Sequence, residues 1–113
     1  MSSNITRDVI VKADLFNQPV LANANILPSN LAGIHKPISY FILTFCFQGA
    51  GIFNIMRTKD GVSLPEGYRE AATLVPNGAY IHAIAVSTGE TINFQYTTAT
   101  TLTSLKVLET VDQ

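Results

Sequence analysis

The longest apolar run of the chain is ISYFILTFCF, at residues 38–47. Its large side chains recur at every second position: Phe41, Leu43, Phe45 and Phe47. This period is typical of a β-strand that buries one face. Pro37 favours an extended start, because the residue before a proline is pushed out of helical conformation. The run is about half as long as the roughly 20 residues of a membrane helix, and Ser39 and Thr44 interrupt it. It therefore predicts a central, buried strand.

The alternation of apolar and polar residues continues elsewhere in the chain. It is clearest at residues 91–97, where Ile92, Phe94 and Tyr96 face inward. The residues expected to face outward there are Thr91, Asn93, Gln95 and Thr97. We predict further strands at five places: 20–27, 52–58, 69–75, 79–86 and 101–111. The third of these also has helical spacing, but glycine and proline bracket it and leave too few residues for a stable helix.

Two of these strands carry a pattern that assigns their faces. Residues 20–27 place four apolar side chains on one face: Val20, Ala22, Ala24 and Ile26. Residues 101–111 place Leu105, Val107 and Glu109 on one face and Leu102 on the other.

Turn signals separate the strands at intervals of about ten residues. Asp60-Gly61 and Asn77-Gly78 supply the positive φ angles that tight turns need. Roughly eight strands with this spacing predict an all-β fold, an antiparallel β-sandwich of jelly-roll type forming a single domain over residues 1–113. An immunoglobulin-like sandwich is the nearest rival, but its cysteine and tryptophan landmarks are absent. We expect the core to contain Phe41, Leu43, Phe45, Phe47, Ile84, Val86, Ile92 and Phe94.

Charged residues are scarce, at 13% of the chain against about 25% in typical proteins. The net charge of −1 provides no basic field to hold nucleic acid. Threonine, serine, asparagine and glutamine cover the surface instead, and these side chains cost little entropy to bury against a partner. The composition predicts a subunit that covers part of itself with copies of itself; a soluble monomer with a threonine-rich sheet is the alternative. The first residues lack an apolar stretch, so we expect no signal peptide.

Residues with metal-binding or nucleophilic chemistry are few. The single cysteine, Cys46, lies within the apolar run and is predicted to be a small, buried core residue. His82 lies on the apolar face of its strand, which is typical of a core or interface histidine. His35 precedes Lys36-Pro37 and is predicted to lie in a loop. A zinc site needs three or four ligands, and no such set can be assembled.

The carboxylates fall mostly in or beside predicted turns and termini, where solvated charge is expected: Asp8, Asp14, Asp60, Glu66, Glu70, Glu90, Glu109 and Asp112. Glu70 and Glu109 could meet across a sheet, but no pattern brings them together. The chain has no nucleophile elbow, phosphate-binding loop or dinucleotide-binding glycine motif. We therefore predict no enzyme activity, no cofactor, and no catalytic or metal-binding residue.

A carbohydrate- or receptor-binding module is the alternative class of function. Sandwich domains of this size often stack aromatic rings on a sugar, and the chain lacks tryptophan, the strongest platform. Four tyrosines could substitute: Tyr40, Tyr68, Tyr80 and Tyr96. Tyr80 and Tyr96 lie on apolar strand faces, where core packing is the simpler role. The sequence assigns no ligand-binding residue.

The last third of the chain carries two apolar strands joined by a glycine-acid turn. These are LVPNGAYIHAIAV at residues 74–86 and STGETINFQY at residues 87–96, followed by a threonine-rich strand that ends in LKVLE at residues 105–109. The stretch resembles the closing strands of small jelly-roll proteins in bacterial and archaeal virus particles, and it is similar to trimeric C1q/TNF-like sandwiches.

The resemblance implies a structural, self-assembling virion protein, such as a capsid, decoration or tail-accessory subunit, without catalytic activity. Its partners would be copies of itself, with a trimer favoured, together with other virion subunits and a glycan where the particle surface carries the receptor site. It would be located in the virion after assembly in the host cytoplasm, with no membrane span.

Overall fold

Eight β-strands make up the ordered framework in the computed structural model, which describes residues 9–67 and 73–110. They are β1 (Val9–Val20), β2 (Leu31–Ala32), β3 (Ile38–Phe47), β4 (Phe53–Lys59), β5 (Val62–Gly67), β6 (Tyr80–Ser87), β7 (Glu90–Tyr96) and β8 (Thr100–Thr110). All named strand pairs are antiparallel. The described part of the chain contains no helix that could span a membrane.

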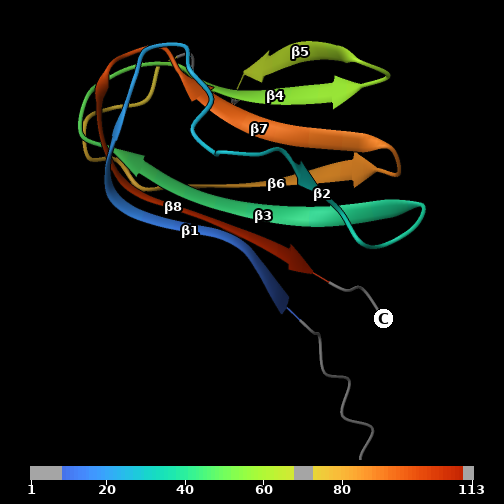
Figure 1. Ribbon diagram of the computed structural model, residues 1–113. Helices are drawn as coiled ribbons and strands as arrows, with labels where there is room; N and C mark the ends of the chain where they lie inside the picture. The colour runs from blue at the N-terminus through green and yellow to red at the C-terminus, as the bar shows by residue number, and fades with distance from the viewer. Residues whose placement is uncertain (1–8, 68–72, 111–113) are drawn as a thin grey trace, which may run out of the picture.

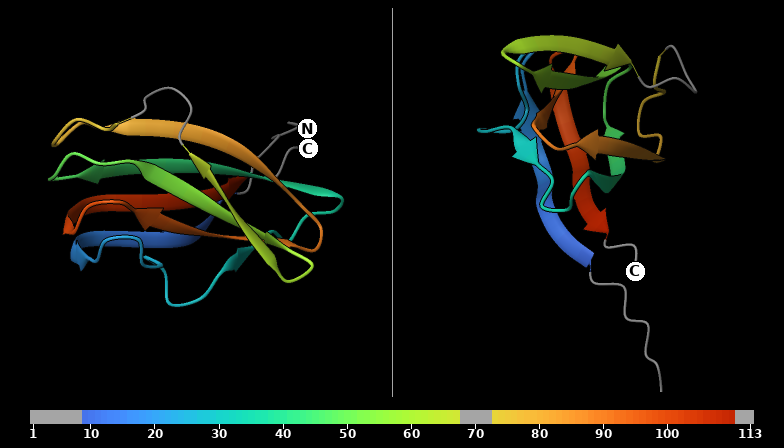
Figure 2. Two further views of the ribbon diagram at one scale, coloured as in Figure 1. Left: turned by 90° about the horizontal axis from the view of Figure 1, so that it is seen from above. Right: turned by 90° about the vertical axis from the view of Figure 1, so that its right-hand side faces the viewer.

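The strands form two four-stranded sheets that pack face to face (Figure 1, Figure 2). The first sheet has the order β1-β8-β3-β6, and the second has the order β2-β7-β4-β5. Consecutive strands mostly alternate between the sheets, so the chain repeatedly crosses the sandwich. This is the two-sheet arrangement of a jelly roll. The predicted antiparallel β-sandwich of about eight strands is confirmed.

The core lies between the sheets, and all eight predicted core residues are buried. Aromatic rings from both sheets meet at its centre. The ring centroids of Phe45 and Phe53 lie 4.2 Å apart, and those of Phe47 and Tyr96 lie 3.8 Å apart. Burial raises the pKa of Tyr96 to about 12, and its protonated hydroxyl donates a hydrogen bond to the Gly49 carbonyl at 2.7 Å. Tyr96 is therefore a core residue, as its alternating position predicts.

The predicted faces of residues 101–111 are wrong at one end, because the alternation reverses inside β8. Leu102 and Leu105 are both buried, although three positions separate them. Against β3, the pairing shifts by one residue between Cys46 and Phe47, which leaves Thr103 as the extra residue of a bulge. In β1, Asn17 has a φ of 47° near the same level. The bulge turns Leu102 into the core.

The predicted strand at 20–27 is also wrong. The first strand ends at Val20, and the segment after it crosses to the second sheet. There the backbone N–H groups of Asn23 and Ile26 donate to the carbonyls of Tyr96 and Phe94. A φ of 56° at Asn23 prevents a regular strand, because extended residues need negative φ.

This crossing segment covers part of β7, so Asn93 does not face solvent as predicted. Asn93 is buried, and its amide mimics a strand backbone. Its Oδ1 accepts the N–H of Leu27 at 3.1 Å, and its Nδ2 donates to the carbonyl of Leu27 at 3.1 Å. The same amide donates to Asn30 at 2.9 Å.

Other predicted strands agree with the structure within a residue or so. The predictions at 38–47, 52–58, 79–86 and 91–97 correspond to β3, β4, β6 and β7. Most of the predicted strand at 69–75 lies outside the described residues; within it, Leu74 is buried and forms an isolated bridge with Gly51. Most of β1, and all of β2 and β5, were not predicted.

Candidate functional site

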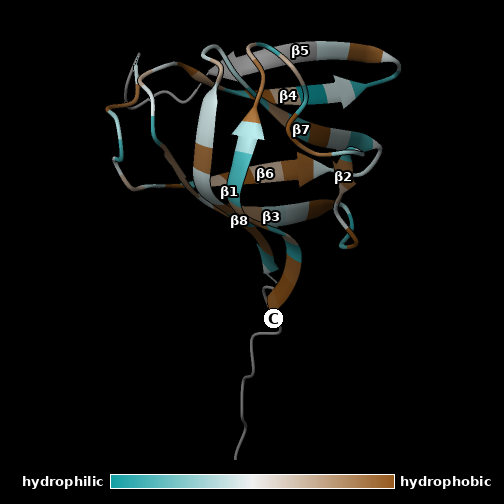
Figure 3. Cartoon of the chain, turned by 60° about the vertical axis from the view of Figure 1, so that its left-hand side comes forward, coloured by the Kyte–Doolittle hydropathy of each residue, from teal (hydrophilic) through white to brown (hydrophobic). Residues whose placement is uncertain are grey.

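The outer face of the β1-β8-β3-β6 sheet carries several exposed apolar side chains. We call it the outer face, meaning the outward side chains of these four strands. Read in rows from β1 to β6, they are Val9, Thr110, Tyr40 and Ala85; Val11, Leu108, Ile42 and Ala83; Asp14, Lys106, Thr44 and Ile81; and Phe16, Ser104 and Cys46. Figure 3 shows hydrophobic residues in β6 and at the lower end of this sheet.

Large apolar side chains on the outer face are unusually exposed. Phe16 is 66% exposed and Ile81 is 65% exposed, at opposite edges of the sheet. Val9, Val11 and Tyr40 are each about half exposed. An antiparallel sheet with one solvated face normally presents polar residues there. Several exposed, large apolar side chains on one face of a sheet indicate an interaction site.

The outer face carries two charged residues among its described positions. Asp14 and Lys106 are Cα partners in the β1–β8 pairing and have opposite charges. The surface therefore has no net charge, but covering it would desolvate both charged side chains, which costs free energy unless they pair well.

A shallow hollow of about 270 Å³ lies at the β3–β6 side of the outer face. It is lined by Thr44, Cys46, Ala79, Tyr80, Ile81 and Ser104, among others. The prediction that Cys46 is a buried core residue is therefore wrong: its side chain is half-buried and borders this hollow. Its neighbours Phe45 and Phe47 both face the core, so the position between them must point outward.

Sequence reasoning missed Phe16 because it missed β1. The alternation in β1 is irregular, since the pairing of β1 with β8 shifts between Val11 and Ala13. The apolar residues before and after this bulge then belong to opposite faces. Val9 and Val11 face outward, whereas Ala13 and Leu15 pack on the core. A search that allowed one bulge would have found the strand.

A separate cluster of polar residues, which we call the Glu109 latch, lies inside the sandwich. It comprises Lys12, Ile34, His35, Ser39 and Glu109, which come from β1, the β2–β3 connection, β3 and β8. Glu109 is an exception to the solvated charge expected for most carboxylates: it shares the inward face of Leu105 and Val107, as the alternation predicts, and its side chain is 0% exposed. Glu109 Oε2 accepts the N–H of Ile34 at 2.8 Å and lies 2.7 Å from His35 Nδ1.

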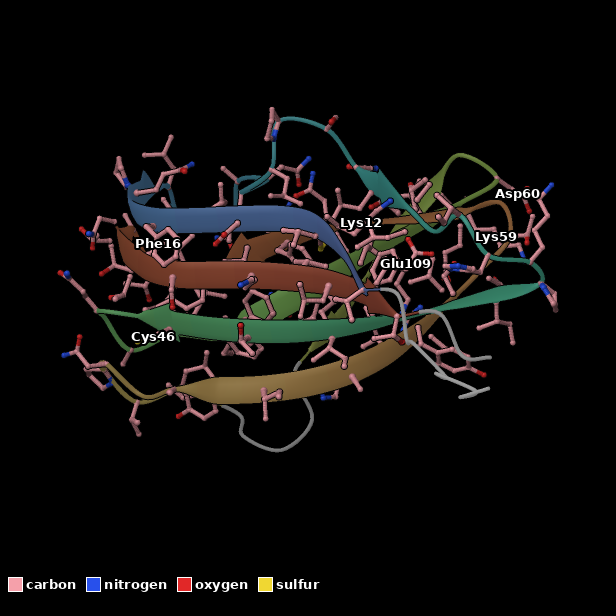
Figure 4. The ribbon with its side chains drawn as sticks, turned by 90° about the horizontal axis from the view of Figure 1, so that it is seen from below. Lys12, Phe16, Cys46, Lys59, Asp60 and Glu109 are labelled. Atoms are coloured by element: carbon pink, nitrogen blue, oxygen red, sulfur yellow. The ribbon has the colours of Figure 1, made fainter. Side chains whose placement is uncertain are left out.

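The remaining contacts complete the Glu109 latch. Glu109 Oε1 lies 3.4 Å from the ammonium of Lys12. Burial tends to raise the pKa of Glu109, but hydrogen bonds from Ser39, Ile34, His35 and Lys12 outweigh it and lower the pKa to about 2. The carboxylate is thus ionised at neutral pH and ties the β2–β3 connection to β8 and β1. Figure 4 shows Lys12 and Glu109 close together where these strands meet.

The Glu109 latch contains the residue types of a hydrolase triad but not its geometry. In a triad, the serine hydroxyl contacts the imidazole nitrogen opposite the carboxylate. Here, Ser39 Oγ accepts the backbone N–H of His35 at 3.0 Å and donates to its carbonyl at 3.3 Å. The serine therefore holds the loop backbone, and the arrangement is suited to fixing a connection. His35 lies in that loop, as predicted.

The remaining sequence candidates lie apart from these two places. His82 is half-buried and faces inward as the Cα partner of Leu43. Glu90 accepts a hydrogen bond from Arg57 at 3.0 Å, and the same guanidinium group donates to the Ala85 carbonyl, which links the two sheets at one end. Glu70, which could meet Glu109 across a sheet, lies outside the described residues. Within residues 9–67 and 73–110, no three His, Cys, Asp or Glu side chains gather as metal ligands do.

Similarity to known proteins adds nothing to this geometry. The chain matches no family model and no curated protein.

Proposed function

We propose that the protein is a structural, self-associating subunit of virion type, without catalytic activity, that covers its outer face with other copies. The observation that carries this proposal is the outer face, which has no net charge and on which Phe16 and Ile81 are both about two-thirds exposed. The jelly-roll order of the sheets supports it, because capsid proteins of many viruses use this architecture. Lectin domains use it too, so the order of the strands alone carries no function.

Covering the outer face offsets much of the free-energy cost of association. Fully burying a large apolar side chain contributes about 1.5–3 kcal/mol. Five such side chains on the outer face are about half exposed or more: Val9, Val11, Phe16, Tyr40 and Ile81. Covering them contributes roughly 5 kcal/mol per copy, or roughly 10 kcal/mol for a pair. This is comparable to the ~4–15 kcal/mol that association costs, and the half-buried Ile42 and Leu108 add to it.

The proposed place in a particle is that of a capsid, decoration or tail-accessory subunit, with other virion subunits as further partners. The trimer remains a prediction from the likeness to virion and C1q/TNF-like sandwiches. Charged residues make up only 13% of the chain, which supports a closed assembly. Contacts between copies remove surface from water, so fewer charged residues are needed to keep the remaining surface soluble.

Glycan binding has less support as the function. Among the described tyrosines, Tyr80 stacks on Phe45 and Tyr96 stacks on Phe47, so both rings are committed to packing. The ring of Tyr40 is exposed, but it lies on the outer face that the proposal covers. A glycan array tests this role directly.

Light scattering coupled to size exclusion at tens of micromolar tests the proposal. We expect a mass of more than one chain for the natural sequence. Ile81→Asp should release single chains, because it places a carboxylate in the covered surface. The matched control is Val62→Asp, which changes a 57% exposed apolar residue on β5, in the other sheet, and should leave the mass unchanged. A single-chain mass for the natural sequence would refute the proposal.

A further inference from the structure

We infer that the partner on the outer face is a second copy related by a two-fold axis, with Phe16 of each copy inserted into the hollow beside Cys46 of the other. This inference rests on the proposed self-association, replaces the trimer predicted from the likeness to other sandwiches by a two-fold pair, and adds the central contact. Phe16 is the most exposed large apolar side chain of the outer face, and the hollow lies on the same face. The inference follows from the relative positions of these two features.

Phe16 and the hollow lie at the same level along the strands. Phe16 and Cys46 are both Cα partners of Ser104, so the three residues form one row across β1, β8 and β3. Phe16 stands at the β1 edge of this row, and the hollow occupies its β3–β6 side. Figure 4 shows Phe16 and Cys46 at the same end of the outer face, on either side of β8.

A two-fold axis in the plane of the interface, parallel to the strands and near β8, exchanges these two sides. Rotation about it keeps the position of each residue along the strands and moves the β1 side of one copy over the β3–β6 side of the other. Each Phe16 ring then lies over the partner's hollow, and the contact occurs twice. The Phe16 contact is mutual, as a two-fold interface requires, although an axis near β8 also brings the Lys106 side chains of the two copies together, which costs electrostatic energy.

The hollow has the chemistry and size for an aromatic ring. Its side chains are uncharged and include the thiol of Cys46, and sulfur packs favourably against ring edges. A volume of about 270 Å³ accommodates the ring of one phenylalanine side chain.

The outer face is also large enough for a dimer. Four strands at a spacing of ~4.8 Å, each contributing about eight residues at ~3.3 Å, cover roughly 500 Å² in projection. This is of the same order as the ~800 Å² per partner of a stable interface.

Photo-cross-linking tests the arrangement and keeps an aromatic ring at position 16. A disulfide would not, because facing sheets lie about 10 Å apart and a disulfide requires Cα atoms within ~7 Å. Phe16→p-benzoylphenylalanine should give, on irradiation, a covalent dimer whose peptide map joins position 16 of one copy to the β3 or β6 residues that line the hollow of the other. Val62→p-benzoylphenylalanine is the matched control and should give no specific dimer.

A second variant measures the contribution of the ring. Phe16→Ala should raise the dimer dissociation constant roughly a thousandfold, because two anchoring side chains are lost per dimer. Its melting curve, measured at a concentration where both proteins are single chains, should match that of the natural sequence, since Phe16 is exposed. Val62→Ala should leave the dissociation constant unchanged.

The outcomes separate the two proposals. If the natural sequence is a single chain, the proposed function fails. If it self-associates as a trimer, if the photo-cross-link joins position 16 to residues away from the hollow, or if Phe16→Ala binds normally, the two-fold arrangement is overturned and the proposed function stands.

Discussion

Replacing Glu109 by glutamine gives a quantitative test of the Glu109 latch. The change keeps the size of the side chain and removes its charge. The carboxylate is fully buried, and its two closest partners are the N–H of Ile34 and the Nδ1 of His35. Glutamine can still accept the Ile34 hydrogen bond, but it cannot pair with the charge of Lys12. The variant should therefore fold and be less stable at neutral pH.

The expected magnitude follows from the pKa of Glu109. That pKa falls from 4.5 to about 2, a difference of about 2.5, which corresponds to roughly 3 kcal/mol of stability. Because the folded pKa is the lower one, the unfolded chain binds more protons between these two pH values. The stabilisation is complete above about pH 4.5 and is lost as the pH falls towards 2.

Urea unfolding at a series of pH values from 7 to 2, at one protein concentration, measures this effect. The natural sequence should lose roughly 3 kcal/mol more than Glu109→Gln between pH 4.5 and 2. Asp60→Asn serves as the control, because Asp60 is exposed in a turn with a φ of 53° that asparagine tolerates; its acid profile should follow the natural sequence. If Glu109→Gln shows the same acid loss as the natural sequence, Glu109 is not the group responsible and the reasoning is refuted.

Two further substitutions test the packing around the core and the latch. Phe45→Ala should lower the free energy of unfolding by about 3–5 kcal/mol in urea titrations, because it removes a buried ring stacked on Phe53 and leaves a cavity; a loss below 1 kcal/mol would contradict this packing. Gly33→Ala should destabilise the β2–β3 connection, because its Cβ would overlap the side chain of Ser39. Hydrogen exchange should show faster exchange at the Ile34 amide, and protection equal to that of the natural sequence would argue against the overlap.

Local alternation was enough to predict the fold class and the core. Residues 38–47 and 91–97 place large side chains at every second position, and the backbone geometry of a strand turns that period into one buried face. This relation involves near neighbours in the chain, so it can be read without knowing the pairing. The eight predicted core residues are buried for this reason.

The outer face and the Glu109 latch could not be predicted in the same way, because pairing between distant residues creates them. Glu109 and His35 are 74 positions apart, and Asn93 and Leu27 are 66 positions apart. A polar side chain is buried when a distant segment supplies its hydrogen bonds, and the sequence pattern around Glu109 is the same whether or not it does. Likewise, Phe16 and Cys46 share a row because β8 pairs with both strands, a placement that no local period contains.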